Sequence, residues 1–352
     1  MKAAVYHGRG DIRVEDRPEP QVRPGTLKLK IDWCGICGTD LHEYEEGPIF
    51  VPKPGQPHPI TGETLPLILG HEFAGTVVEV GPEVSGFKVG ERVAVDPIFA
   101  SGDDDECRRG DYHLCRKLGF QGLSGGGGGF SEYVVALAER SHSLGDLSPE
   151  IGAMVEPISV AFHAVRQSGI RPGDTAVVYG AGPIGQSAIL CLRAAGAGAV
   201  VVVDPAAARQ RMARMLKADV VLDPREVDVA AEVLRLTRGR GAEVVLDCAG
   251  VNATVSGAMD TVRRGGTIVM IAIWGHPAKI DMLSLVLREI KLVGSICYNN
   301  DFPRVIRLLR DGRIDPTPMI TKRIGVDDIV PEGFEELVHN RDKHVKILVQ
   351  PN

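Results

Sequence analysis

The chain has 352 residues, of which 44% are hydrophobic and 24% are charged, a composition typical of globular proteins. A chain of this length is expected to fold as two domains. The formal net charge of −6 and the aromatic content of 5% argue against a nucleic acid partner. No apolar run reaches the ~18 residues that a membrane-spanning helix needs, so we expect no membrane partner.

The seven cysteines indicate whether the protein works in an oxidising or a reducing compartment of the cell. Their number is odd, the chain is long, and the N-terminal segment lacks the apolar core of a signal peptide. These features argue against a disulfide framework. We therefore expect reduced thiols and a cytoplasmic location.

Short strand-like segments separated by glycine and proline fill the first part of the chain. Each is apolar, β-branched and bounded by turn residues, which predicts an irregular, mostly antiparallel β domain. The predicted strands are residues 28–33, 75–80, 92–96 and 132–136. Residues 47–66 carry six prolines without helical periodicity and are predicted to form a long, functional loop. The five-glycine run 125–129 is flexible in isolation and leads into a strand near Phe130.

Three fragments carry residues that suit a metal: residues 34–42 read CGICGTDLH, residues 70–72 read GHE, and residues 156–157 read EP. Cysteine, histidine and glutamate suit zinc, with three protein ligands and one open position for a substrate oxygen. Zinc would polarise an alcohol there and lower its pKa. We predict Cys37, His71 and one of the two glutamates Glu72 and Glu156 as ligands.

The spacing of Cys34 and Cys37 also fits a zinc ribbon or a redox C-x-x-C motif, but no second C-x-x-C and no thioredoxin-like pattern accompanies it. Cys37 is preferred as the ligand because Thr39 and His42 follow it at useful spacings. The Thr39 hydroxyl can accept the proton of the alcohol, and His42 can pass that proton to water. An ordinary surface histidine is the alternative interpretation of His42.

From residue 175 onward, strands alternate with helices. Continuous apolar runs fit strands that are buried on both faces, and the alternation is typical of a doubly wound parallel sheet. The predicted strands are 175–179, 199–203, 219–222, 243–247, 267–272 and 291–296, and the predicted helices are 183–195, 206–217 and 227–237. A helix near 302–310 and a strand near 346–349 follow, and we expect this tail to pack on the first domain.

Residues 180–185, GAGPIG, match G-x-G-x-x-G between the first strand and first helix of this region. Gly180 permits the tight turn, Gly182 lets a pyrophosphate approach the backbone, and Gly185 allows close packing of helix on strand. Pro183 and Ile184 open the helix, whose N-terminus attracts the phosphates. Asp204, at the end of the next strand, can bind the ribose hydroxyls and repel a 2′-phosphate, which favours NAD over NADP. The nearby Arg209 and Arg211 keep the NADP alternative open.

Together these motifs resemble the medium-chain zinc alcohol dehydrogenases over nearly the whole chain. Within that family they look most like the 2,3-butanediol (acetoin) and sorbitol dehydrogenase branch. Residues 55–66, GQPHPITGETLP, look like the insertion typical of butanediol dehydrogenases.

The resemblance implies an α/β protein with a GroES-like, mostly β catalytic domain at 1–153, completed by the tail 299–352. A Rossmann NAD-binding domain would span 154–298, with the active site in the cleft between the domains. The resemblance further implies Cys37 and His71 as zinc ligands and Thr39 and His42 as a proton relay. Asp204 and Arg209 would hold the adenosine ribose. Glu72 and Glu156 both occupy positions that ligate or approach zinc in the family, and the choice between them stays open.

The sequence departs from the family at one place. Many relatives bind a second, structural zinc through four cysteines spaced C-x2-C-x2-C-x7-C. Cys107 and Cys115 keep the last interval, but Ser101 and Asp104 stand at the first two positions. We expect a metal-free lobe, because serine is a poor zinc ligand. A weak site formed by Asp103 or Asp104 with the two thiols is the alternative.

The leading hypothesis is reversible oxidation of a secondary alcohol or vicinal diol, best 2,3-butanediol, with hydride transfer to NAD. A sorbitol, other polyol or L-threonine dehydrogenase is the alternative within the family. A zinc-free quinone or enoyl reductase and a non-enzymatic NAD-binding protein are disfavoured by the full ligand and relay set. Family resemblance suggests a homodimer or homotetramer joined through the Rossmann domains, with residues 267–273 and 291–296 compatible with that contact. The candidate substrate walls are the loop 47–66 and the residues Ile49, Phe50, Phe120 and Ile273.

Overall fold

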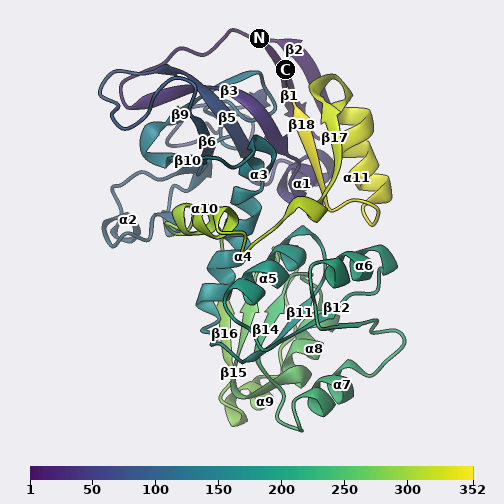
Figure 1. The fold of residues 1–352 in the computed structure, drawn as a ribbon. Helices are drawn as coiled ribbons and strands as arrows, with labels where there is room; N and C mark the ends of the chain where they lie inside the picture. The colour runs from purple at the N-terminus through teal and green to yellow at the C-terminus, as the bar shows by residue number, and fades with distance from the viewer. Residues whose placement is uncertain (352) are drawn as a thin grey trace. The chain divides into compact units, whose positions relative to one another are not determined.

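The computed structural model describes residues 1–351 (Figure 1). They form two compact units. Unit 1 contains residues 1–156, 302–306 and 320 onward, and unit 2 contains residues 157–301 and 307–319. The domain boundaries expected at 153/154 and 298/299 stay predictions.

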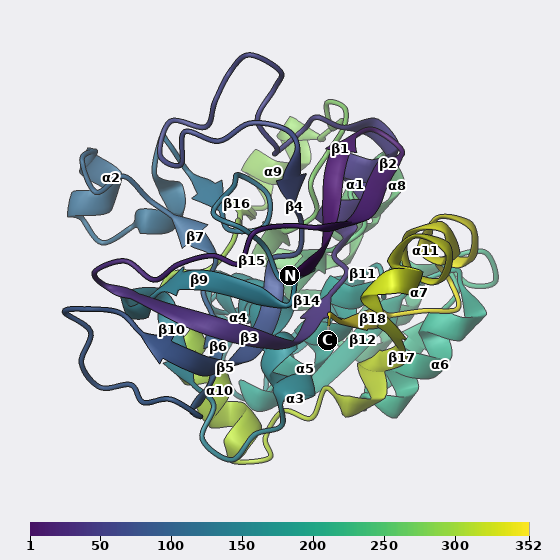
Figure 2. The same ribbon diagram turned by 90° about the horizontal axis from the view of Figure 1, so that it is seen from above.

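Unit 1 is built on a mostly antiparallel sheet with the strand order β10-β6-β5-β3-β18-β17, and β9 also pairs with β3. Seen from above, β3, β5, β6, β9 and β10 lie together (Figure 2). The strands of this sheet are β3 (Thr26–Gly35), β5 (Glu72–Val80), β6 (Arg92–Val95), β9 (Tyr133–Leu137), β10 (Ser141–Ser143), β17 (Ile320–Gly325) and β18 (Lys346–Gln350). The four strands predicted in this part of the chain are confirmed as β3, β5, β6 and β9.

Smaller elements complete unit 1. β1 and β2 form an antiparallel hairpin whose first strand also pairs with β4, and β7 pairs with β8. These strands are β1 (Lys2–Gly8), β2 (Asp11–Asp16), β4 (Leu67–Ile68), β7 (Ile98–Phe99) and β8 (Gly119–Phe120). The helices are α1 (Gly38–Glu46), α2 (Asp105–Arg108), α3 (Pro149–Ala153) and α11 (Glu335–Asn340). The predicted loop 47–66 contains neither helix nor strand.

The apolar alternation of the unit 1 strands creates one core. Leu27, Leu29 and Ile31 of β3 point to it together with Phe73 of β5 and Ile347 of β18, and each is buried. β18 pairs antiparallel with β3 and parallel with β17, so the end of the chain belongs to this sheet.

Unit 2 contains a wholly parallel sheet with the strand order β13-β12-β11-β14-β15-β16. The order reverses between β11 and β14, as in a doubly wound sheet. Its strands are β11 (Thr175–Tyr179), β12 (Ala199–Val203), β13 (Val220–Leu222), β14 (Ala242–Asp247), β15 (Val262–Met270) and β16 (Lys291–Gly294). Its helices are α5 (Pro183–Ala194), α6 (Ala207–Met215), α7 (Val229–Leu236), α8 (Asn252–Thr261) and α9 (Met282–Leu287).

All six predicted strands and the three predicted helices of this region are confirmed, with ends shifted by a few residues. α8 and α9 were not predicted. The chain changes unit within the helix α4 (Val155–Gln167), directly before and again within the helix α10 (Phe302–Arg310), and once more between residues 319 and 320. Within residues 1–351, every helix is too short or too polar to cross a membrane.

Candidate metal and cofactor sites

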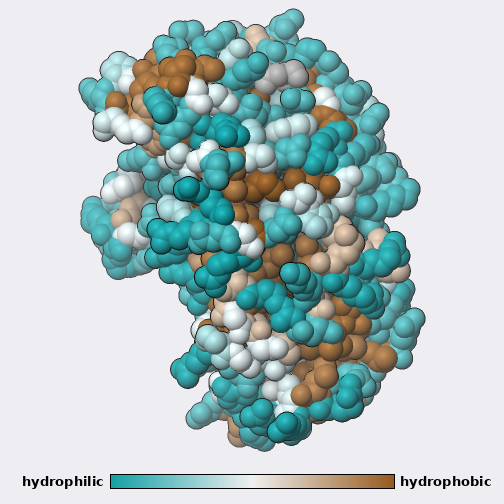
Figure 3. Space-filling view, viewed as in Figure 1, coloured by the Kyte–Doolittle hydropathy of each residue, from teal (hydrophilic) through white to brown (hydrophobic). Residues whose placement is uncertain are grey.

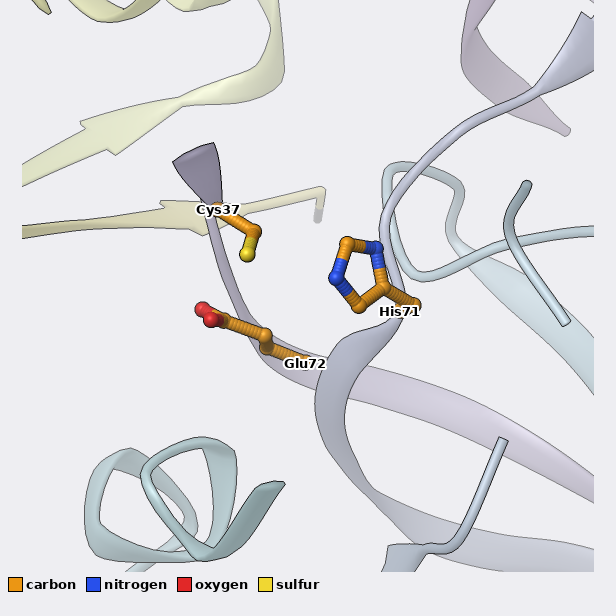
Figure 4. A group of neighbouring side chains, drawn as sticks. All are labelled: Cys37, His71 and Glu72. Atoms are coloured by element: carbon orange, nitrogen blue, oxygen red, sulfur yellow. The ribbon is translucent and has the colours of Figure 1, made fainter. Parts of the chain in front are cut away.

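The side chains of Cys37, His71 and Glu72 converge in unit 1 (Figure 4). One ligand atom from each lies within 4.8 Å of the others. Cys37 is the N-cap residue of α1, and His71 directly precedes Glu72, the first residue of β5. The pairing of Gly35 with Glu72 brings the end of β3 beside the start of β5, so residues far apart in sequence meet there.

Asp40 organises two of these residues. One carboxylate oxygen, Oδ2, accepts a hydrogen bond from the Cys37 backbone N–H at 2.9 Å. The other, Oδ1, lies 3.5 Å from Nδ1 of His71. Both Oδ1 and Nδ1 are buried without a closer partner among the described residues. A carboxylate facing Nδ1 leaves Nε2 of the ring for a metal.

The donor set fits zinc. A thiol, an imidazole and a carboxylate are the ligands that this ion takes in catalytic sites. Burial and the nearby Glu72 carboxylate raise the pKa of the Cys37 thiol. A divalent cation would supply the positive charge that a buried thiolate needs.

Lys346 of β18 lies against this group and was not anticipated from the sequence. Its ammonium donates to both carboxylate oxygens of Glu72, at 2.7 and 2.5 Å, and to the carbonyl oxygen of Ile36 at 3.2 Å. Burial lowers the pKa of Lys346, but Glu72 and Cys37 outweigh burial and leave it raised. Glu72 therefore already faces a buried positive charge.

Glu156 is buried and contributes to the raised pKa of Lys346, so its charge acts on the same group. Its carboxylate is not among the converging ligand atoms found in residues 1–351, which come from Cys37, His71 and Glu72.

Thr39 and His42 both lie on α1. The Cys37 thiol donates to Oγ1 of Thr39 at 3.7 Å, which places this hydroxyl beside the candidate metal ligand. His42 is exposed, as a residue that exchanges protons with water must be. The Cys34 thiol is fully buried and bonds the carbonyl oxygen of Gly35, so it belongs to the core.

The five-glycine run 125–129 is fixed in place beside the candidate metal ligands. The N–H of Gly129 donates to the carbonyl oxygen of Gly70 at 2.8 Å, and that of Phe130 to Leu69 at 3.1 Å. A Cβ at Gly129 would lie 2.6 Å from the Cys34 sulfur. The run therefore packs directly against the segment that presents His71, and only glycine permits this approach.

The glycine motif of unit 2, the candidate phosphate loop, has a backbone that requires glycine at two positions. Gly180 has φ +89°, a conformation that favours glycine, and follows the last residue of β11. Gly182 is the N-cap residue of α5, and a Cβ placed there would meet nothing within 4 Å. A Cβ at Gly185 would collide with the backbone of Gly180. Pro183 and Ile184 form the first turn of α5, whose N-terminus favours an anion.

Asp204 follows β12 and is buried. One of its oxygens accepts from the Ala181 N–H at 2.7 Å and the other from the Ala206 N–H at 2.8 Å. These bonds fix the carboxylate beside the phosphate loop. Arg209 approaches it at 3.9 Å.

The lobe around Cys107 and Cys115 is held by hydrogen bonds. Asp104, rather than Asp103, groups with the two thiols. Its carboxylate accepts from the N–H of Cys107 and of Arg116, both at 2.8 Å. Burial and Asp104 raise the pKa of Cys107 to about 11, which favours a protonated thiol.

The candidate substrate walls lie in different surroundings. Phe50 and Phe120 are partly buried against the core of unit 1, whereas Ile49 is 44% exposed. Ile273 belongs to unit 2 and is also exposed.

Comparisons with known proteins agree with this architecture. Residues 23–146 match the family model described as alcohol dehydrogenase GroES-like domain, and residues 183–311 match zinc-binding dehydrogenase. The chain is 44% identical to the (R,R)-butanediol dehydrogenase of Neisseria gonorrhoeae over the full length of both proteins.

Solved structures show the same fold. The crystal structure of 2R,3R-butanediol dehydrogenase from Bacillus subtilis superimposes with a TM-score of 0.94 at 45% identity, covering 100% of this chain and 99% of that one. A putative zinc-binding dehydrogenase from Sinorhizobium meliloti, bound to NADP, gives 0.88 at 32% identity, covering 99% of each chain.

The chain belongs to the zinc-dependent medium-chain alcohol dehydrogenases. It is an oxidoreductase that uses zinc and a nicotinamide dinucleotide, with the GroES-like and Rossmann folds expected from its sequence.

Proposed function

We propose that the protein interconverts 2,3-butanediol and acetoin, with NAD as the hydride acceptor. The observation that carries the proposal is the group of the partly buried Cys37 with the buried His71 and Glu72, with Thr39 beside it. The full-length similarity to two butanediol dehydrogenases gives the substrate class. A vicinal diol offers a second oxygen that can reach the metal or a nearby glutamate.

When bound, zinc would supply Lewis acid chemistry that lowers the pKa of the alcohol. Cys37 and His71 would hold it, with His71 oriented by Asp40. Thr39 would accept the proton of the substrate hydroxyl, and the exposed His42 would deliver it to water.

We propose Glu156 as the third ligand. Glu72 lies closer to Cys37 and His71, but its charge is already compensated by Lys346. A zinc ion held by Glu72 would also face that ammonium, and like charges in a buried site repel strongly. Glu156 can complete the ligand set while the ion pair of Glu72 and Lys346 stays intact.

We propose NAD rather than NADP because of Asp204. Its buried carboxylate is fixed by two backbone N–H groups and would repel a 2′-phosphate. The positive charge of Arg209 already faces this carboxylate. Gly180, Gly182, Pro183, Ile184 and Gly185 would hold the pyrophosphate.

We propose a single zinc in each subunit. Asp104 already bonds two backbone N–H groups, and the N–H of Ser101 donates to the Cys115 sulfur at 3.3 Å. These bonds support a lobe that folds without metal.

We also propose that the protein is a cytoplasmic homo-oligomer, at least a dimer. The helix α9 exposes Met282, Leu283, Val286 and Leu287, each at 60% or more. Hydrophobic residues, drawn in brown, also reach the surface in the part of the view where unit 2 is drawn (Figure 3). β16 ends the order of its sheet, so its free edge can pair with a second copy.

A substrate panel with NAD and NADP tests the proposal. We expect 2,3-butanediol to give the highest kcat/KM, and NAD to be preferred. A clearly higher kcat/KM with sorbitol or L-threonine would assign the protein to the alternative activity.

A further inference from the structure

Glu43 is a buried acidic residue of α1 that the proposed chemistry does not use. It lies three residues after Asp40, so the two carboxylates share one face of the helix. Both side chains are fully buried. Asp40 faces His71, and Glu43 stands one turn farther from Cys37 on that face.

The Glu43 carboxylate binds the backbone that follows the helix. It accepts hydrogen bonds from three successive N–H groups, those of Ile49 at 3.0 Å, Phe50, and Val51 at 3.1 Å. Three donors compensate the buried charge and fix the conformation of a segment that has neither helix nor strand.

The same residue is anchored through its own backbone. The Tyr6 hydroxyl donates to the Glu43 carbonyl oxygen at 2.7 Å, and the N–H of Gly47 donates to it at 3.0 Å. Burial and Glu43 raise the pKa of Tyr6 to about 12, so its hydroxyl remains a donor. α1 is therefore tied both to the hairpin strand β1 and to the loop after it.

The segment held in this way carries apolar side chains. Val51 is buried in the core of unit 1, Phe50 is partly buried against that core, and Ile49 is 44% exposed. The hydrogen bonds of Glu43 therefore do not serve to bury Ile49. A helix rises about 1.5 Å per residue, so Glu43 lies roughly 9 Å along the axis from Cys37. One short helix thus fixes Cys37, Thr39 and, through Glu43, the Ile49–Val51 backbone.

We propose that Glu43 is a positioning residue: it holds the backbone of residues 49–51 so that Ile49 and Phe50 form an apolar wall of the alcohol site. This rests on the proposed alcohol dehydrogenase function. The wall would contact the carbon chain of the substrate, while the metal ligands and the cofactor loop stay unaffected.

The test is steady-state kinetics of Glu43→Gln, with Glu46→Gln as the matched control. Glu46 is exposed on the same helix, and the control removes the same charge. We expect Glu43→Gln to raise KM for the preferred alcohol about tenfold, with kcat, KM for NAD and zinc content unchanged. Glu46→Gln should match the wild type. An unchanged alcohol KM in Glu43→Gln would overturn the proposal.

A second variant tests the proposed wall if Glu43→Gln fails to fold. Ile49→Ala changes an exposed side chain and should leave the melting temperature unchanged. We expect it to raise the KM for the alcohol several-fold. An unchanged KM would overturn the proposal that this segment forms a wall of the alcohol site. The substrate panel on the wild type judges the proposed function separately, because the variants are compared on whichever alcohol the wild type oxidises best.

Discussion

Glu72 and Glu156 differ in the charge that already faces each of them. Lys346 donates to both oxygens of Glu72, and the charge of Glu156 helps to raise the pKa of Lys346. We expect Glu156→Gln to lose most of the bound zinc and Glu72→Gln to retain it, measured as zinc per subunit. The opposite order of zinc loss would make Glu72 the third ligand.

His142 of β10 gives a second prediction at the residue scale. Burial and the nearby Arg140 lower its pKa from 6.5 to about 4. Between these two values the unfolded chain binds the proton and the folded chain does not. The free energy of unfolding therefore falls as the pH drops from 6.5 to 4, by about 3 kcal/mol from this residue.

His142→Phe should remove this dependence, because the new ring can still pack on Phe302, whose centroid lies 5.4 Å from that of His142. Urea unfolding of both proteins at pH 7 and pH 4.5 measures it. The variant should lose less stability on acidification than the wild type does. Equal losses would show that His142 does not titrate in this way.

At the scale of the element, the glycine run supports the segment that presents His71. We expect Gly129→Ala to lower the free energy of unfolding by about 1–3 kcal/mol, because its Cβ would crowd Cys34 and Phe73 at 2.6 Å. Gly325→Ala is the control, because a Cβ there meets nothing within 4 Å and that glycine has no positive φ. Equal stability of Gly129→Ala and Gly325→Ala would argue against this tight packing.

The Cys107 lobe yields another prediction at this scale. Ser101→Cys combined with Asp104→Cys restores the four-cysteine spacing, so zinc should rise from about one to about two per subunit. Metal analysis of both proteins measures this change. About two zinc ions in the wild type would contradict the metal-free lobe.

The elements that the sequence predicted are those with strong apolar periodicity. β11, β12 and β14 are continuous runs of buried residues, and α5 follows a recognisable glycine motif. α1 could not be predicted in this way, because its sequence GTDLHEYEE has no apolar stripe and its N-terminus depends on a bond between Asp40 and the Cys37 N–H. α8 was missed for a similar reason, since alanine, glycine and threonine make up half of it.

The residues of the candidate site likewise differ in whether a local sequence pattern could predict them. Cys37, His71 and Glu72 lie within short motifs whose residue types suit zinc, so the sequence could name them as candidates, with Glu156 as the alternative to Glu72. Lys346 and Glu43 act through contacts that form only in the folded chain. Lys346 bonds Glu72, which lies 274 positions away in the sequence, and Glu43 bonds the backbone of the loop that follows α1. No local sequence pattern predicts that a lysine of the last strand contacts this site.

At the scale of the whole molecule, the apolar surface of α9 predicts the assembly. We expect Val286→Glu with Leu287→Glu to shift the protein toward the monomer in light scattering, because two buried charges would oppose the contact. An unchanged mass would place the interface elsewhere.

The proposed oxidation of the alcohol by NAD depends on one zinc ion that Cys37 would hold. The most direct measurement is zinc content and 2,3-butanediol turnover of Cys37→Ser beside Cys34→Ala, which removes the neighbouring core thiol. We expect Cys37→Ser to lose both zinc and turnover, and Cys34→Ala to keep about one zinc and its activity. Retention of zinc and turnover in Cys37→Ser would show that Cys37 does not hold the zinc ion that the reaction needs.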